Sequence, residues 1–305
     1  MRTAGVNSSE PSLSDSYQTW FNLDQWINLN TKGFNNWQRI ELLNCVTRYF
    51  ISLQISNPNS VYKKFQQELR DKKLLTKTDL RKFDSKEVNI PGTFKVRNGA
   101  FVCGTFQATI TSERYKLLRK MGSAEEILAM LLRYSILPSP PLSWQIPNGV
   151  FKYMVEEHGL TLEGCASPIN SQLLALGGNY CSPCQGDEIF GSLGSLFDNN
   201  LEGLVSMINP PYVEDFMNLA AKKIESTFNT TQLNTMMVFL GPKWSDAEFY
   251  SILSNSDYTK AVYQLPKNQH SYEDAGIKKL AKFDSTIFVL ANYDVDVSEI
   301  VSLFK

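Results

Sequence analysis

The stretch from residue 203 to residue 240 decides the fold class. It begins with Gly203-Leu-Val-Ser-Met-Ile-Asn-Pro-Pro-Tyr212, continues through a segment of helical period at residues 216–228, and ends with Met236-Met-Val-Phe-Leu240. Short apolar runs of this kind predict buried strands, and a helix between two of them is typical of parallel strands. The stretch therefore predicts a strand–helix–strand unit of an α/β sheet.

Similar runs surround this unit and extend the predicted sheet. Leu160-Thr-Leu-Glu-Gly164 precedes it, and residues 261–265 and 286–290 follow it. Residues 147–158 predict a helix that starts at a proline, with Val150, Phe151, Met154 and Val155 on one side. We expect a mostly parallel sheet that binds its ligand at the carboxyl ends of its strands, where the strand order reverses.

The first half of the chain reads as mostly helical. Apolar residues at intervals of three and four predict helices at residues 20–28, 37–56 and 61–73. A fourth helix is expected at residues 123–134, where Ser123 and Glu126 have the spacing of a capping box. Between them, Asn98-Gly99 predicts a hairpin turn.

The domain boundary is expected at the proline-rich segment Leu137-Pro-Ser-Pro-Pro141, because proline continues neither a helix nor a central strand. We predict a disordered tail at residues 1–16, a mostly helical domain at 17–138 and an α/β domain at 139–305. Between residues 61 and 120 there are 15 Lys and Arg against 6 Asp and Glu. This basic segment indicates either a polyanionic partner or a solvated helix face.

Composition excludes several classes of protein. The 305 residues contain no apolar run long enough to cross a bilayer, and the polar start of the chain does not resemble a secretory signal. The five cysteines are too few and too irregular for a disulfide scaffold, and Cys181-Ser-Pro-Cys184 would have only His158 and His270 to complete the four ligands of a structural zinc site. We expect an intracellular protein with reduced thiols and no metal; nucleus and cytoplasm both stay open.

Asn209-Pro210-Pro211-Tyr212 follows a predicted strand directly and has the residue types of a catalytic clamp. The lone pair of an adenine amino group is delocalised into the ring, so that nitrogen is a poor nucleophile. Two acceptors on its hydrogens, the Asn209 amide oxygen and the Pro210 carbonyl, favour a tetrahedral nitrogen. The prolines stiffen the loop, and Tyr212 offers a face on which a base can stack. The alternative is a Pro-Pro turn that happens to follow a strand.

A second loop follows the first predicted strand of the sheet. Glu163-Gly-Cys-Ala-Ser-Pro-Ile-Asn170 is an acid followed by small residues, which let a nucleotide-like ligand approach the main chain. Because the pattern is weaker than G-x-G-x-x-G, an ordinary turn is the alternative reading.

Together these segments resemble the cap-specific adenosine N6-methyltransferases known as phosphorylated-CTD-interacting factors. The resemblance covers residues 144–293 and is carried by three segments in the family's order: Ala166-Ser-Pro-Ile-Asn170, Phe190-Gly-Ser-Leu-Gly194 and the clamp. The flanking segments Trp144-Gln-Ile-Pro147 and residues 238–244, 270–272 and 285–292 are also similar to the family's.

The resemblance implies a Rossmann-like class I methyltransferase domain that uses S-adenosylmethionine to methylate N6 of a 2′-O-methyladenosine beside the mRNA cap. The catalytic residues carried over are Asn209, Pro210, Pro211 and Tyr212. The residues implied to lie against the methyl donor are Glu163, Ser167, Pro168, Asn170, Ser192 and Asp198. The chain departs from the family at Cys165 and Leu193.

Candidates for contact with RNA are weaker. A methylated guanine is cationic and is well held between aromatic faces, for which Trp244 and Tyr272 are candidates, with His270 on a phosphate. A core tryptophan and a histidine that caps a turn are the alternatives. The side chains of Lys63, Lys64 and Arg70 are candidates for contact with the RNA backbone. The spacing around Trp20 and Trp37 does not predict the WW module that docks some members on RNA polymerase, so we expect no such docking.

Two other functions stay open. The same chemistry on DNA or on internal RNA adenines would use the same clamp, because the clamp recognises only the base edge. A catalytically silent RNA-binding subunit with this fold is the alternative from another class.

Overall fold

A computed structural model of the chain describes residues 67, 70, 71, 95–97, 100–103, 106–124, 126, 127, 130, 131, 134, 145–182, 184–274 and 277–305. The chain divides into two compact units, residues 1–112 with 123–138 and residues 113–122 with 139–305. The predicted tail and the predicted helices at 20–28 and 37–56 lie outside the described residues, as does most of the helix predicted at 61–73.

The first unit contains a three-stranded antiparallel sheet. Strands β1 (Lys95–Arg97) and β2 (Ala100–Cys103) pair with Arg97 opposite Ala100, which leaves two residues between them and confirms the predicted hairpin. Strand β3 (Phe106–Thr109) adds a third strand that the sequence did not predict. The predicted capping box is also confirmed: the Ser123 N–H donates to Glu126 Oε2 at 2.6 Å, and the Glu126 N–H donates to Ser123 Oγ at 3.1 Å.

The second unit is built on a six-stranded sheet with the order β5-β4-β6-β7-β11-β8. Its strands are β4 (Leu162–Glu163), β5 (Asn179–Tyr180), β6 (Val205–Ile208), β7 (Met236–Pro242), β8 (Thr259–Leu265) and β11 (Ser285–Ala291). Strand β4 is parallel to β5 and to β6, and β6 is parallel to β7, whereas β11 is antiparallel to both its neighbours. This doubly wound order, with one antiparallel strand inserted near an edge, is the Rossmann-like arrangement of class I methyltransferases.

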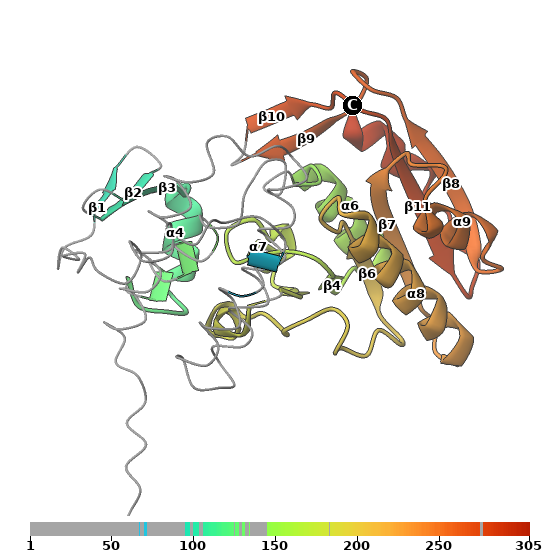
Figure 1. Ribbon diagram of the computed structural model, residues 1–305, viewed down its shortest axis with the longest axis horizontal. Coiled ribbons are helices and arrows are strands. Elements are labelled where there is room, and N and C mark those ends of the chain that lie inside the picture. The colour runs from blue at the N-terminus through green and yellow to red at the C-terminus, as the bar shows by residue number, and fades with distance from the viewer. Residues whose placement is uncertain are drawn as a thin grey trace, which may run out of the picture. The chain divides into compact units, whose positions relative to one another are not determined.

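Helices connect the strands and cover the sheet (Figure 1). They are α6 (Asn148–His158), α7 (Gln172–Ala175), α8 (Glu214–Thr230) and α9 (Glu248–Asn255), with the 3₁₀ segments η2 (Gln185–Phe190) and η3 (Ser298–Phe304). Helix α4 (Ser112–Leu118) begins at Ser112, which is assigned to the first unit, and its other residues belong to the second unit. A hairpin of β9 (Ser271–Asp274) and β10 (Ile277–Leu280) precedes β11.

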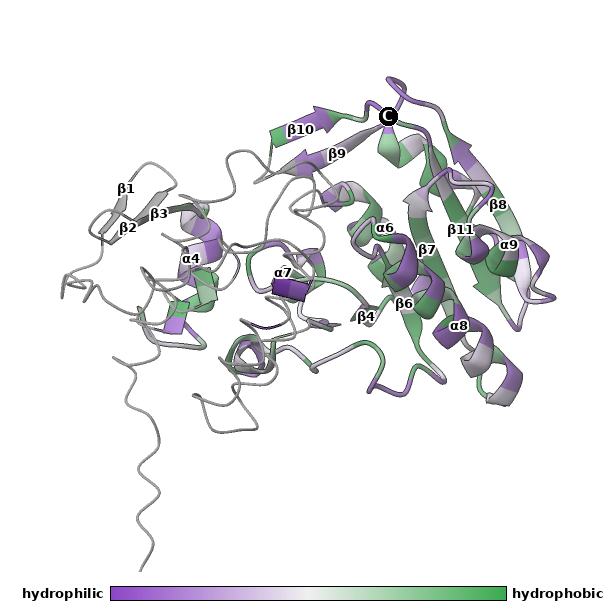
Figure 2. Cartoon of the chain, viewed as in Figure 1, coloured by the Kyte–Doolittle hydropathy of each residue, from purple (hydrophilic) through white to green (hydrophobic). Residues whose placement is uncertain are grey.

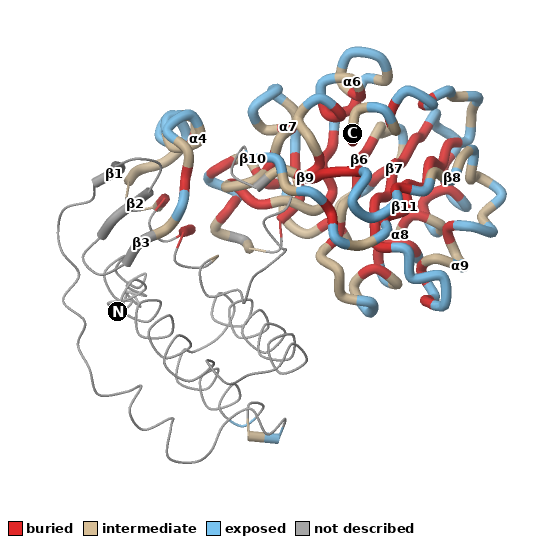
Figure 3. The backbone as a smooth tube through the Cα atoms, turned by 90° about the horizontal axis from the view of Figure 1, so that it is seen from above, coloured by how far each residue is buried: buried red, intermediate tan, exposed pale blue. Residues whose placement is uncertain are grey.

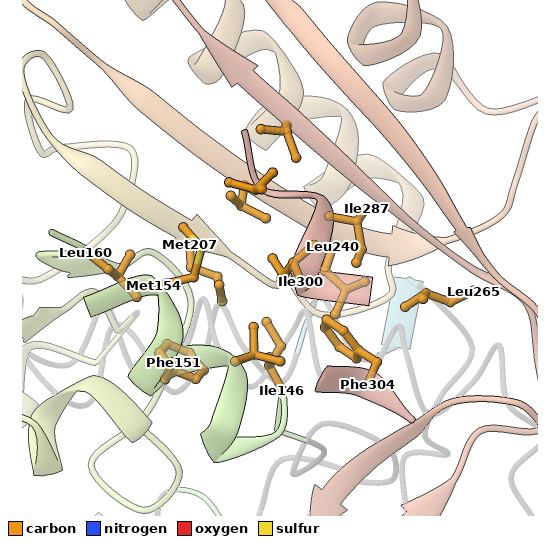
Figure 4. Packing of buried hydrophobic residues seen from close by; sticks show 14 of the residues in the cluster. Ile146, Phe151, Met154, Leu160, Met207, Leu240, Leu265, Ile287, Ile300 and Phe304 are labelled. Atoms are coloured by element: carbon orange, nitrogen blue, oxygen red, sulfur yellow. The ribbon is translucent and has the colours of Figure 1, made fainter. Parts of the chain in front are cut away.

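Two apolar cores lie on opposite faces of the sheet, because successive side chains of a strand point to opposite faces. On β7, Met236, Val238 and Leu240 belong to one core, and Met237 and Phe239 belong to the other. The first core is closed by α6 and η3, as the side chains of Phe151, Met154 and Phe304 show in Figure 4. The second is closed by the buried faces of α8 and α9.

Central and edge strands differ in burial. All seven residues of β7 and of β11 are buried, which explains the apolar runs at residues 236–240 and 287–291. In the edge strand β8, partly covered residues alternate with exposed ones up to the buried Leu265. Figure 2 shows the same contrast in hydropathy, and Figure 3 shows the buried residues concentrated on the central strands. No helix in the described ranges has both the length and the apolar character needed to span a membrane.

Candidate functional site

The loops after β4 and β6 leave the sheet side by side, at the position where the strand order reverses. Glu163 is paired with Met207, and the Gly164 N–H donates to the Met207 carbonyl at 2.8 Å. Open α/β sheets bind their ligands at this reversal point. The structure therefore brings together residues 163–170 and the clamp, the two segments whose sequences predict ligand contact.

Gly164 allows this close approach. A Cβ atom at this position would lie 2.8 Å from Ile208 Cγ1 and 3.2 Å from Leu196 Cδ1. Ile208 is the last residue of β6 and precedes the clamp. A residue without a side chain is therefore required where the loop after β4 (residues 164–170, here called the first loop) passes the start of the clamp.

The Asn209 side chain carries the clearest sign of a ligand site. Its Oδ1 atom is buried and accepts no hydrogen bond from any described residue. A buried acceptor without a donor costs roughly 1–3 kcal/mol, so native structures seldom keep one without a reason. Pro210 beside it is buried, and Pro211 and Tyr212 are partly covered. An amide oxygen in this state suits a ligand that brings its own N–H.

Tyr212 is held at both its ring and its hydroxyl. The ring packs edge-to-face on Phe283 with centroids 5.6 Å apart and an interplanar angle of 89°. The hydroxyl lies 2.9 Å from the Tyr272 hydroxyl. Burial raises the pKa of Tyr212 well above its ordinary value, and the neighbouring Tyr272 adds to this, so the phenol is neutral at physiological pH.

The Glu163 carboxylate is directed at the start of α7 and not outward from the carboxyl ends of the strands. Its Oε2 atom accepts from Ser171 Oγ at 2.8 Å and from the Leu173 N–H at 3.1 Å, so it binds the start of α7. Burial raises the pKa of Glu163 to about 7, although these hydrogen bonds and the charge of Arg114 oppose the shift. Glu163 therefore shapes the first loop from within.

Ser167 and Asn170 close the first loop on itself. The Ser167 N–H and hydroxyl donate to Asn170 Oδ1 at 2.7 and 2.9 Å, and the Asn170 N–H returns to Ser167 Oγ at 3.3 Å. Pro168 between them is buried. The loop thus has a defined shape beside the clamp, which is what a preorganised ligand loop requires.

Ser192 and Asp198 lie in the connection between β5 and β6. Ser192 is buried; its Oγ accepts the Ser182 and Gly194 N–H groups, each at 3.1 Å. It therefore organises a turn that runs beside the end of β5, where it forms a bridge with Tyr180. Asp198 is exposed further along the connection. Like Glu163, Ser167 and Asn170, Ser192 is thus engaged in hydrogen bonds within the chain.

Three of the six candidates for contact with RNA, Trp244, His270 and Tyr272, follow the carboxyl ends of β7 and β8, and the clamp follows the carboxyl end of β6. Trp244 follows the carboxyl end of β7 and is 36% exposed, with its ring against Phe249. Tyr272 and His270 are each 1% exposed, so neither offers a ring face or a nitrogen to solvent in this structure. Lys63 and Lys64 lie outside the described residues, and Arg70 is a partly buried helical residue of the first unit.

Sequence reasoning missed four residues that support the site. Arg114 of α4 donates to the Ser171 carbonyl and lies near Glu163. Ser171 bonds to Glu163, Phe283 packs on the Tyr212 ring, and Ser285 bonds to Tyr272. Most of these contacts join segments that are far apart along the chain, so a local sequence pattern does not reveal them. The contact between Ser171 and Glu163, eight residues apart, is the one that a local pattern could have indicated.

The fold family implies S-adenosylmethionine, and the residues at the reversal point fit such a group. The buried Asn209 Oδ1 atom lies there without a donor, and hydrogen bonds between Ser167 and Asn170 hold the neighbouring loop in one shape. Within the described ranges, no group of three or more His, Cys, Asp or Glu side chains could hold a metal ion. Cys165, Cys181 and Cys184 carry free thiols.

Comparison with known proteins gives the family. The family model described as "Phosphorylated CTD interacting factor 1 WW domain" matches residues 108–275, more than half of the chain. Although that description names a WW domain, the matched residues include strands β4 to β8 of the α/β sheet. A search of the curated proteins found no match.

Among solved structures, a protein of Listeria monocytogenes described as a class I S-adenosylmethionine-dependent methyltransferase is 14% identical, with a TM-score of 0.33 over 89% of this chain and 100% of that one. TrmN from Thermus thermophilus is 11% identical, with a TM-score of 0.33 over 84% of this chain and 80% of that one. Both scores are low, so the fold rests on the sheet order itself. The chain belongs to the phosphorylated CTD interacting factor 1 family, and its second unit has the Rossmann-like fold of class I methyltransferases.

Proposed function

We propose that the chain transfers a methyl group from S-adenosylmethionine to N6 of an adenine in RNA, and that its substrate is the 2′-O-methyladenosine beside the mRNA cap. The observation that carries the proposal is the buried, unpaired Asn209 amide oxygen at the strand-order reversal. Family membership and the class I fold support methyl transfer, and the clamp sequence supports an amino nitrogen as the acceptor.

In this proposal, the Asn209 amide oxygen and the Pro210 carbonyl accept the two hydrogens of the adenine amino group. Two acceptors favour a tetrahedral nitrogen, concentrate its lone pair toward the methyl donor and disperse the positive charge that develops there. The Tyr212 ring stacks on the base and fixes its plane. Bound S-adenosylmethionine supplies an electrophilic methyl group, and the residues at 163–170 are proposed to hold it in line with the amino group.

The partial burial of the clamp gives the two acceptors their strength. Water that would compete for the amino hydrogens is excluded around a buried oxygen, and a hydrogen bond in such surroundings is worth more than in bulk water. Because the clamp belongs to a proline-stiffened loop at the end of a buried strand, its acceptors need little rearrangement when the base arrives.

The test is methyl transfer by the full chain to a short capped RNA that begins with 2′-O-methyladenosine. Parallel reactions use the RNA without the 2′-O-methyl group, the RNA without the cap, an RNA with an internal adenine, and a DNA oligonucleotide. We expect the first substrate to react fastest. An equal rate without the cap would contradict the cap-adjacent substrate, and preference for DNA or internal adenines would favour the alternative substrates.

Two substitutions at Asn209 separate an enzyme from a silent binding subunit. Asn209→Ala removes an acceptor and should lower the rate by about 10²–10³-fold, in the range for the loss of one preorganised transition-state contact. Asn209→Asp keeps an oxygen there and should retain more activity. The matched control is Asn255→Ala, an exposed residue whose amide bonds only Ser251. RNA binding without turnover in the wild-type chain would support the silent subunit instead.

A further inference from the structure

A chain of hydrogen bonds runs from the clamp into the interior of the second unit. The Tyr212 hydroxyl lies 2.9 Å from the Tyr272 hydroxyl, which lies 2.8 Å from Ser285 Oγ. Ser285 Oγ lies 2.9 Å from His270 Nε2, and His270 Nδ1 lies 2.8 Å from the Pro266 carbonyl oxygen. Tyr272, Ser285 and His270 are each no more than 1% exposed, so water does not interrupt the series.

The topology of the sheet assembles this series. Strand β8 ends at Leu265, just before Pro266, and Leu265 is paired with Ser285, the first residue of β11. Ser285 is also paired with Pro242 at the carboxyl end of β7. Because β11 runs antiparallel to β7, its first residue, Ser285, lies at the carboxyl end of β7. The clamp begins at the same end of the sheet, because β6 is parallel to β7.

One end of the series determines the direction of every hydrogen bond in it. The Pro266 carbonyl can only accept, so His270 Nδ1 carries a hydrogen and donates it. In a neutral imidazole the other nitrogen is then an acceptor, and the Ser285 hydroxyl donates to it. Ser285 Oγ consequently accepts from Tyr272, and Tyr272 Oη accepts from Tyr212. The Tyr212 hydroxyl hydrogen therefore points away from the site.

The surroundings favour the neutral imidazole that this direction requires. Burial lowers the pKa of His270, while the bond to Pro266 and the negative charge of Asp284 oppose the shift. The groups that face His270 from the packed segments are Tyr272 on β9, Ser285 on β11 and Asp284 in the preceding loop. The Asp284 carboxylate accepts the Lys267 main-chain N–H at 2.7 Å. The negative charge that acts on His270 is that of Asp284.

Packing restricts the same side chains. Phe283 contacts the rings of Tyr212, Tyr272 and His270, with centroids 5.6, 5.9 and 6.4 Å apart respectively. A phenol held by an edge-to-face contact at its ring and by a directed bond at its hydroxyl has lost most of its rotational freedom before a base arrives. Binding then costs less conformational entropy.

We propose that Tyr272, Ser285 and His270 are positioning residues that hold the Tyr212 ring in the orientation on which the target base stacks. This role rests on the proposed function of the clamp. Protonation of His270 would make Nε2 a donor to Ser285 Oγ, so the Ser285 hydroxyl would lose the acceptor that fixes its direction. The Ser285 hydrogen would then be free to turn toward Tyr272, and the series would no longer hold the Tyr212 hydroxyl in one direction.

The direction can be measured without any activity assay. His158 and His270 are the two histidines of the chain, so a His158→Gln variant leaves one imidazole to observe by nitrogen NMR. We expect His270 near neutral pH to carry its hydrogen on Nδ1, with Nε2 as an acceptor. A hydrogen on Nε2 would overturn the proposed direction.

The positioning role is tested by kinetics on the full chain with the substrate set given above. Tyr212→Phe and Tyr272→Phe each remove a hydroxyl and should lower kcat/KM by about two- to tenfold, the value of one hydrogen bond. The double variant should be no slower than the slower single one, because both changes break the same series. The matched control is Tyr153→Phe, whose hydroxyl lies 3.2 Å from His158 Nε2 in α6 and should leave the rate unchanged.

A pH profile separates positioning from a loss of folding. The wild-type rate should fall as pH decreases through the pKa of His270. In His270→Gln, whose amide oxygen can still accept from Ser285 but does not titrate, the fall should be absent. Methyl transfer that is unaffected by Tyr272→Phe, or losses that add in the double variant, would overturn the positioning role alone. No methyl transfer by the wild-type chain to any adenine would overturn the proposed function and the role together.

Discussion

Replacement of Gly164 by alanine tests the close contact on which the site is built. The added Cβ would lie 2.8 Å from Ile208 Cγ1, closer than real Cβ contacts come. Leu196 Cδ1, at 3.2 Å, is the end of a flexible side chain and can move. Ile208 Cγ1 is attached directly to the branched Cβ of a buried strand residue, so the main chain of β4 or β6 must shift.

We expect Gly164→Ala to lower the free energy of unfolding by about 1–3 kcal/mol, the usual cost of overpacking a core. For a domain of this size each kcal/mol lowers the Tm by roughly 2–4 °C. Methyl transfer should fall by more than the loss of folded protein explains, because Ile208 is joined directly to Asn209. The assays are thermal unfolding and initial rates at a temperature where both proteins are folded.

Gly149→Ala is the matched control, because a Cβ atom there meets no heavy atom within 4 Å. Gly149 lies in α6, where alanine is the better helix former, so the variant should be neutral or more stable by at most about 1 kcal/mol. In a double-mutant cycle, Ile208→Ala removes the clashing Cγ1, and Gly164→Ala should cost less in that background. An unchanged Tm and rate in Gly164→Ala would refute the close contact.

Three further outcomes follow from the charges and hydrogen bonds described above. The raised pKa of Glu163, about 7 against an ordinary 4.5, means that the folded protein binds the proton more tightly. Wild type should therefore lose up to roughly 3 kcal/mol relative to Glu163→Gln as pH rises from 4.5 through 7, and parallel Tm–pH curves would contradict this. The lowered pKa of His270 has the opposite sign: its stabilising contribution is present above the ordinary histidine value of about 6.5 and is lost as pH falls below it, so His270→Gln should flatten the acid side of the Tm–pH curve. Lys222 and Glu248 form a 2.8 Å ion pair between α8 and α9, but both side chains are about half exposed, so Lys222→Ala should change the free energy of unfolding in urea by less than about 1 kcal/mol.

Features that depend on nearby residues were predictable from the sequence. The five predicted strands are present as β4, β6, β7, β8 and β11, because their apolar character records burial in the sheet. The helix predicted at residues 216–228 is α8, and the capping box at Ser123 formed because its two partners are three residues apart. The position of the clamp after β6 was predictable for the same reason.

The short strand β5 and the 3₁₀ segments were not predictable in this way. Strand β5 has two residues, and its exposed Asn179 gives no apolar run. The antiparallel direction of β11 was also missed, because a strand buried on both faces has the same apolar pattern in either direction. An apolar pattern shows that a strand is buried, but it does not show which strands lie beside it or in which direction they run.

The sequence by itself determined the class of fold and the segment that is proposed to do the chemistry, since both follow from periodicity and from residue types at a strand end. Only the tertiary structure decided which groups surround that segment. Tyr272 and His270, predicted to face RNA, are buried behind Tyr212, and Glu163 is directed at the start of α7. The physical reason is that a polar side chain takes whichever partner the sheet order brings near when both leave water, and most of those partners lie far away along the chain.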